Sequence, residues 1–131
     1  MKKAFALILG MLVLAGCAQK IEDSQADEVI SNARPVTQSM LTSLEQGDLN
    51  GFTENMSPEM KDYFSEDKFQ ELRTYVSENL GSFKSLNEAS VDLVQRYYRV
   101  SFSASFEKDN ATVLVSFLEN DLSTVQGLFF Q

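Results

Sequence analysis

The chain has 131 residues, which suits a single domain, and its formal net charge at pH 7 is −8. This charge argues against nucleic-acid binding, which depends on neutralising phosphates with clustered basic residues. The sequence has no histidine and one cysteine. That composition excludes Ser-His-Asp and Cys-His catalysis, histidine metal sites and an internal disulfide bond. We therefore expect no nucleic-acid partner, no cofactor and no metal site.

The N-terminal segment has the features of a secretion signal. Lys2 and Lys3 precede an uncharged apolar run over residues 4–16. As a helix this run would be about 20 Å long, which is shorter than the ~30 Å hydrocarbon core of a bilayer. The length fits a signal peptide over residues 1–16 better than a permanent membrane anchor. Two alternatives stay open: a permanent membrane anchor, and an ordinary signal peptide that is cleaved elsewhere.

The run ends in Leu14-Ala15-Gly16-Cys17, which resembles the lipobox of bacterial lipoproteins. The resemblance implies cleavage between Gly16 and Cys17, and lipidation of Cys17. Acyl chains on this cysteine would hold the protein on a membrane, because each buried CH₂ group contributes about 0.8 kcal/mol. The expected location is the cell envelope, facing the periplasm or the exterior. By the same resemblance, Ala18 permits the outer membrane if the cell has one.

Residues 17–28 are predicted to be the lipidated cysteine and an acidic tether, and residues 29–131 a single α+β domain. Val29, Ala33, Val36, Met40 and Leu44 recur at helical spacing. Pro35 leaves two alternatives open for this helix. Either the helix is kinked there, or its regular part begins near Pro35. Gly47 is a suitable helix stop.

Three helix starts are predicted downstream of Gly47. Asp48, Ser57 and Ser65 each have a side chain suited to an N-cap, and Pro58 suits a first helical position. A further apolar stripe at helical spacing belongs to the helix that follows Ser65 and ends at Gly81; it consists of Phe69, Leu72, Val76 and Leu80.

After Gly81 the apolar period changes from that of a helix to that of a strand. Strands are predicted over 89–94, 98–107, 111–117 and 125–130, with turns at 108–110 and 119–121. Helices followed by a run of strands predict an α+β fold, in which the helices pack on one face of an antiparallel sheet of about four strands.

Several segments resemble the nuclear-transport-factor-two-like superfamily, and more closely a prokaryotic domain family of unknown function within it. They are 44–52, 57–61, 69–81, 98–107 and 127–129. The resemblance implies a cone-like, cystatin-like roll with a curved sheet. It also implies that homodimers, where present, form through the outer sheet face. It brings no activity, because the family has none assigned.

The candidate pocket lies inside the expected cone, where Tyr98, Phe102, Phe106 and Phe117 could line it. Enzymes of the superfamily place a carboxylate and a tyrosine there. Tyr98 would be the tyrosine, but Asp92 falls on the opposite strand face, where a solvent-exposed position is favoured.

Arg96 and Arg99 lie beside Tyr97 and Tyr98 in the sequence. They could clamp an anionic ligand or form ordinary surface ion pairs. Acidic side chains cluster within residues 62–67 and within residues 107–109. Neither cluster has the spacing of a calcium loop.

We therefore predict a membrane-anchored, non-enzymatic module that binds a protein partner or a small apolar ligand. The alternatives are an isomerase- or dehydratase-like enzyme that uses the cone, and a purely structural envelope protein. A homodimer stays an alternative, although the Ser- and Arg-rich face of strand 98–107 weakens it.

Overall fold

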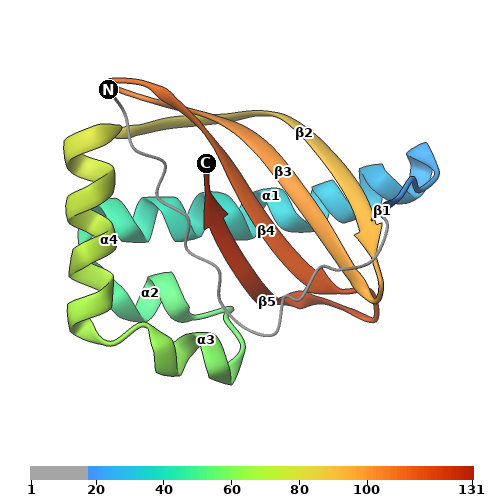
Figure 1. The fold of residues 1–131 in the computed structure, drawn as a ribbon, viewed down its shortest axis with the longest axis horizontal. Helices are drawn as coiled ribbons and strands as arrows, with labels where there is room; N and C mark the ends of the chain where they lie inside the picture. Colours follow the sequence, from blue (N-terminus) through green and yellow to red (C-terminus); the bar gives the residue numbers. More distant parts are fainter. Residues whose placement is uncertain (1–17) are drawn as a thin grey trace.

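The computed structural model describes residues 18–131, in which four helices precede the main strands of one sheet (Figure 1). The predicted cleavage site after Gly16 and the predicted lipidation site Cys17 lie outside the described residues. The elements in chain order are β1 (Ala18–Gln19), α1 (Asp23–Gln46), α2 (Leu49–Thr53), α3 (Pro58–Tyr63), α4 (Glu66–Asn79), β2 (Phe83–Val94), β3 (Tyr97–Phe106), β4 (Asn110–Leu118) and β5 (Asp121–Phe130).

Helix α1 is longer than the sequence predicts. It begins at Asp23, so residues 23–28 of the predicted tether are its first turns. It also continues through Pro35, whose side chain is exposed and therefore does not displace the core. The helix ends as predicted at Gly47, which has a left-handed conformation with φ of 76° and donates its N–H to the carbonyl of Leu44.

The three predicted N-caps are confirmed. Asp48 accepts a hydrogen bond from the backbone of Gly51 at 3.0 Å, Ser57 from Met60 at 3.3 Å and Ser65 from Lys68 at 3.4 Å. These side chains satisfy N–H groups that have no partner within their own helix. The caps divide residues 48–79 into two short helices and the longer α4.

The α+β prediction is confirmed, and the strands form a simple meander in the order β1-β2-β3-β4-β5, with every neighbouring pair antiparallel. Strand β2 begins at Phe83, six residues earlier than predicted. Its register with β3 shifts between Phe83 and Ser85 and again between Leu86 and Ala89, which interrupts the simple alternation of its sequence. The two-residue strand β1 was not predicted.

The core lies between α1 and the inner face of the sheet. Helix α1 contacts β2, β3 and β5, and in Figure 1 it passes behind the strands while α4 stands at one end of the sheet. Phenylalanines supply much of the core, as expected of a chain without tryptophan; those that are fully or almost fully buried are Phe52, Phe64, Phe69, Phe102, Phe106, Phe117 and Phe130.

The outer face of the sheet, opposite α1, is less polar than the sequence of β3 suggests. Arg99, Ser101 and Ser103 lie on it, as predicted from the alternation with the buried residues of β3. However, strands β4 and β5 add apolar side chains to this face. Together with Tyr97 of β3 they form what we call the outer-face apolar patch, which consists of the half-exposed residues Tyr97, Leu114, Leu118 and Phe129.

Candidate functional site

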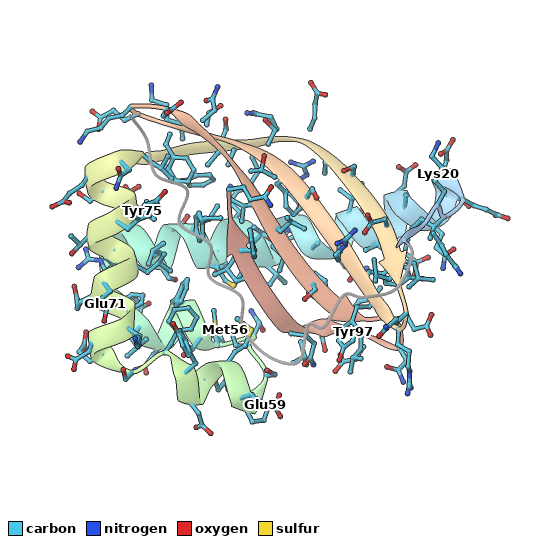
Figure 2. All side chains as sticks on the ribbon, in the orientation of Figure 1. Lys20, Met56, Glu59, Glu71, Tyr75 and Tyr97 are labelled. Carbon is cyan, nitrogen blue, oxygen red and sulfur yellow. The ribbon has the colours of Figure 1, made fainter. Side chains whose placement is uncertain are left out.

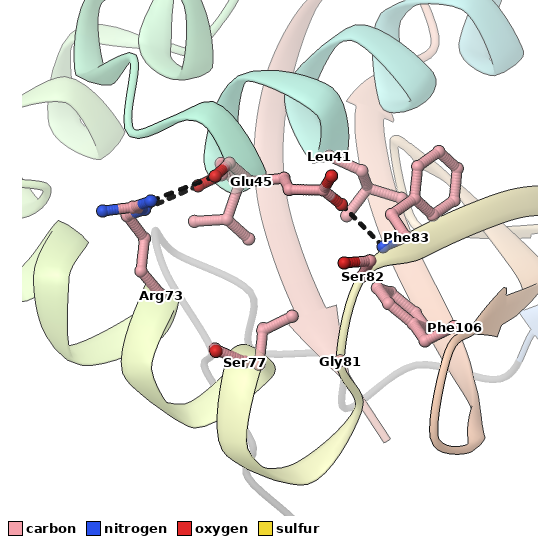
Figure 3. A pocket seen from close by; sticks show the side chains of 10 residues that line it. Leu41, Glu45, Arg73, Ser77, Gly81, Ser82, Phe83 and Phe106 are labelled. Atoms are coloured by element: carbon pink, nitrogen blue, oxygen red, sulfur yellow. Dashed lines mark hydrogen bonds between the residues drawn. The ribbon is translucent and has the colours of Figure 1, made fainter.

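A pocket of about 230 Å³ lies where the C-terminal end of α1, the end of α4 and the start of β2 meet (Figure 3). Its apolar lining consists of Leu41, Leu44, Val76, Phe83 and Phe106. The polar lining consists of Glu45, Arg73, Ser77 and Ser82, and Gly81 completes the wall. Since ligand pockets for drug-sized molecules usually enclose at least about 300 Å³, this one suits a smaller molecule.

Arg73, the positively charged residue that lines this pocket, donates hydrogen bonds to the C-terminal end of α1. The Nε atom of Arg73 donates to the carbonyl of Leu44 at 2.8 Å, and one terminal nitrogen donates to the carbonyl of Glu45 at 3.0 Å (Figure 3). These carbonyls lie at the helix C-terminus, where a cation is favoured by the helix dipole and by the unpaired carbonyl groups. Arg73 therefore joins α4 to α1, and most of its hydrogen-bonding capacity is used within the protein.

Glu45, the negatively charged residue that lines the pocket, also forms a hydrogen bond within the protein. A carboxylate oxygen of Glu45 accepts a hydrogen bond of 2.7 Å from the backbone N–H of Phe83, the first residue of β2 (Figure 3). Charge-assisted hydrogen bonds of this kind are among the stronger ones in proteins. Because both charges already have partners, the pocket favours a small neutral ligand over an ion.

The floor of the pocket depends on a tight turn at Gly81. This residue has φ of +83°, and a Cβ atom there would lie 2.9 Å from the Cβ of Glu107. The neighbouring Lys108 donates its ammonium group to the carbonyls of Ser77 and Glu78 at 3.2 and 3.3 Å, which closes the C-terminus of α4. The turn and this lysine hold the α4 end against the β3–β4 hairpin.

The four predicted pocket residues all belong to the core cluster, and Tyr98 is directly opposite Phe117 in the register. Phe106 lines the pocket at the ends of α1 and α4 and also belongs to the core. Tyr98, Phe102 and Phe117 are 5 %, 0 % and 1 % exposed and are members of the core. Their role as ligand contacts stays a prediction.

Arg34 of α1 covers the ring of Phe102, a contact that periodicity does not predict. Its guanidinium carbon lies 5.3 Å from the ring centroid, and one terminal nitrogen donates to the carbonyl of Leu86 at 3.2 Å. Such a cation–π contact is favourable by about 0.5–2 kcal/mol, depending on its exposure to solvent. The arginine thereby occupies space between α1 and β2 beside the core.

The tyrosine and carboxylate that would form a catalytic pair lie on opposite faces of the sheet. Tyr98 is on the inner face, and its hydroxyl accepts a hydrogen bond from the side-chain amide of Gln25. Asp92 is on the outer face, where its two oxygens accept hydrogen bonds from Arg99 at 2.8 and 2.6 Å. The proposed catalytic pairing of these two residues is therefore not assembled.

Arg99 forms the ordinary ion pair that was one of its two predicted roles. The hydrogen bond and the charge of Asp92 raise the pKa of Arg99 above its usual value, while partial burial opposes this. The backbone of Arg96 joins two turns, because its carbonyl accepts from the N–H of Glu119 at 2.8 Å. Within residues 18–131, no group of three or more metal-ligating side chains is gathered.

Sequence reasoning missed the pocket at the ends of α1 and α4. Each wall was predicted on its own, because Leu44, Val76 and Gly81 belong to recognisable helix patterns. The meeting of the walls depends on contacts between residues far apart in the chain, such as Arg73 with Leu44 and Glu45 with Phe83. The one local signal was the pair of glycine stops, Gly47 and Gly81, which mark the two helix ends.

The fold and the pocket define a small α+β domain with an opening beside its core, and among its described helices none is both long and apolar enough to cross a membrane. A family model with the description "Protein of unknown function (DUF3887)" matches residues 37–128, and the chain belongs to this family. No curated protein and no solved structure matches the chain. The matched region begins within α1 and contains every residue that lines the pocket, but not β1.

Proposed function

We propose that the protein is a lipoprotein of the bacterial cell envelope whose domain binds a small apolar ligand or a partner without catalysing a reaction. The anchor is supported by Leu14-Ala15-Gly16-Cys17 after an uncharged run of signal-peptide length. A further support is that Ala18, the residue after the proposed cleavage and acylation site, lies in strand β1 of the sheet. Membership of the nuclear-transport-factor-two-like superfamily is part of the proposal; the helices that pack on one face of the sheet support it.

The observation that carries the binding function is the pocket of about 230 Å³ at the ends of α1 and α4. Its lining combines apolar side chains with the hydroxyl groups of Ser77 and Ser82. Glu45 and Arg73 are both engaged in hydrogen bonds within the protein. A small neutral molecule with an apolar body therefore fits the pocket better than an ion does, because it leaves these hydrogen bonds intact.

Absence of catalysis is proposed because the groups with catalytic potential are used for structure. Tyr98 is hydrogen-bonded to Gln25, and Asp92 is paired with Arg99 on the other face of the sheet. General acid–base catalysis requires a proton-transfer group within hydrogen-bond reach of the reacting atom. Asp92 does not share a face with Tyr98 and so does not meet this requirement.

The binding proposal is tested by titrating the soluble domain with indole as the probe and following the backbone amides of Phe83 and Phe106 by NMR. We expect saturable shifts at these amides. Ser77→Phe places a ring at the pocket margin and should abolish the shifts, while Thr74→Phe on the exposed part of the same helix should retain them. Shifts that do not saturate, or that survive Ser77→Phe unchanged, would contradict the proposal.

The anchor is tested by growing cells with a labelled fatty acid and isolating the full-length protein. Label should appear in the wild-type protein and be absent from Cys17→Ser. The unlabelled Cys17→Ser product should be either uncleaved, with its apolar leader retained, or soluble. Equal labelling of the two proteins would refute the assignment of Cys17.

A further inference from the structure

Ala18, the residue after the proposed acylation site, lies in β1, an edge strand of the sheet. Ala18 pairs with Val94 in β2, and Val94 pairs in turn with Tyr97 in β3. Since neighbouring strands are about 4.8 Å apart, the backbones of Ala18 and Tyr97 are about 10 Å apart. Cys17 directly precedes Ala18, and consecutive Cα atoms are about 3.8 Å apart. An acyl group on Cys17 would therefore insert into the bilayer close to Tyr97.

The outer-face apolar patch lies on this same side of the sheet. Tyr97 is directly opposite Leu118 in the register, and Leu114 is directly opposite Phe129. All four are half-exposed, and none belongs to the core cluster or packs against it. The patch thus begins about two strands from the anchor position and continues along β4 and β5.

The charges near the patch include the carboxylates of Glu119 and Asp121, the latter directly opposite Leu118, as well as cations that favour contact with a membrane through the outer face. Arg99 and Asp92 pair with each other within this face, so neither presents an unpaired charge to lipid. Exposed Lys20 and Arg96 lie at the same end of the sheet as β1. Figure 2 shows Lys20 and Tyr97 toward this end and Glu71 on the helix at the other end.

Acidic side chains at the start of α1 favour one orientation of the domain on the membrane. Asp23, Asp27 and Glu28 are exposed on the first turns of α1, on the side of the sheet opposite the patch. A domain standing on its β1 end would bring these carboxylates toward lipid headgroups. A domain lying on its outer face would turn them toward water. The second orientation also places a tyrosine at the membrane–water interface, where this residue is favoured.

We infer that the outer face of the sheet rests on the lipid surface, with Tyr97, Leu114, Leu118 and Phe129 in the interfacial layer and the helices turned away. This inference rests on the proposed acyl anchor at Cys17, because the patch alone is too small for stable binding. It assigns the bilayer, and not a second copy of the chain, as the occupant of this face. The pocket at the ends of α1 and α4 then lies away from the anchored end, open to solvent.

Two tyrosines provide a matched pair of probe positions in a chain without tryptophan. Tyr97→Trp places an indole in the patch, and Tyr75→Trp places one at a half-exposed position of α4 (Figure 2). Each acylated full-length variant is reconstituted into phosphatidylcholine vesicles that contain brominated acyl chains, and indole fluorescence is compared with that in unbrominated vesicles. Bromine should quench the indole at position 97 several times more strongly than the indole at position 75.

The outcomes separate the inference from the proposed anchor. If the acylated protein sediments with vesicles but bromine quenches neither indole, the anchor stands and contact through the outer face is refuted. If the protein is not acylated and does not sediment with vesicles, the anchor and the inference fail together. If the indole at position 97 is already shielded without vesicles and the protein sediments as a dimer, a second copy covers the face and the inference is wrong.

A further variant tests the patch itself. Leu118→Glu adds a carboxylate opposite Tyr97 in the register, and should remove most of the quenching at position 97 without preventing sedimentation with vesicles. Thr74→Glu adds the same charge on exposed α4 and should leave the quenching unchanged. Equal quenching in both variants would contradict a lipid contact at Leu118.

Discussion

The guanidinium group of Arg73 lies against Gly47, the residue that ends α1. A Cβ atom at Gly47 would lie 3.1 Å from the guanidinium carbon, and φ at Gly47 is +76°. Glycine is therefore favoured at this position both by the backbone conformation and by the arginine beside it. The pair closes α1 and positions the polar side of the pocket.

Gly47→Ala should lower the free energy of unfolding by about 1–3 kcal/mol, because alanine disfavours a left-handed conformation and its methyl group displaces Arg73. Chemical denaturation of the soluble domain measures this loss. Gly47→Asn is the matched control, since asparagine tolerates the left-handed region better. It should therefore be the less harmful of the two, and equal losses would mean that the backbone conformation is not the cause.

Pro35→Ala should stabilise the domain, because Pro35 lies inside α1 and lacks the N–H that would continue the helix hydrogen bonds. Its side chain is exposed, so the substitution leaves the core intact. The expected gain in the free energy of unfolding is about 1–3 kcal/mol. Pro35→Gly should gain about 1 kcal/mol less than Pro35→Ala. No gain with either variant would contradict a helix that is continuous through this position.

Gln95→Gly should also raise the free energy of unfolding, by about 1 kcal/mol. Gln95 lies in the turn between β2 and β3 with φ of 57°, a conformation that costs a residue with a side chain more than it costs glycine. Gln95→Ala serves as the control and should bring no such gain. Thermal unfolding of both variants distinguishes the turn conformation from a loss of glutamine contacts.

Asp121 provides a prediction on pH. Hydrogen bonds from the side chain and backbone of Ser123 lower the pKa of Asp121. A carboxylate with a lowered pKa in the folded state contributes stability above its unfolded pKa and loses that contribution as the pH falls through the folded pKa. In an NMR titration Ser123→Ala should raise the pKa of Asp121 toward its ordinary value. An unchanged pKa would mean that the hydroxyl group of Ser123 is not the cause.

Local patterns predicted the parts of the fold that depend on neighbouring residues. The strict alternation of residues 98–107 predicted β3 and its buried side, and Asp48, Ser57 and Ser65 predicted three caps, because each signal acts within a few residues. The sequence did not decide whether the helix continues through Pro35, because packing along the whole helix decides whether a proline is tolerated. Strand β1 was missed, because a two-residue pairing has no period of its own.

The candidate site was less predictable than the fold. Phe106 was predicted to line a pocket inside the cone and not the pocket at the ends of α1 and α4. Arg73 and Glu45 were not predicted as site residues, because their roles come from helix ends that meet only in the folded chain. The outer-face apolar patch was also missed. Its residues come from β3, β4 and β5, and only the register brings Leu114 beside Phe129 and Tyr97 beside Leu118.

The central claim is that Cys17 becomes the acylated first residue of the mature protein, directly before β1. Intact-mass measurement of the full-length gene product, extracted from its own membranes, tests this most directly. The account predicts a chain that begins at Cys17 and carries the added mass of a diacylglycerol group, with or without a further acyl chain, and an unmodified residue at this position in Cys17→Ser. A mature chain that begins elsewhere, or one that contains Cys17 as a free thiol, would contradict it.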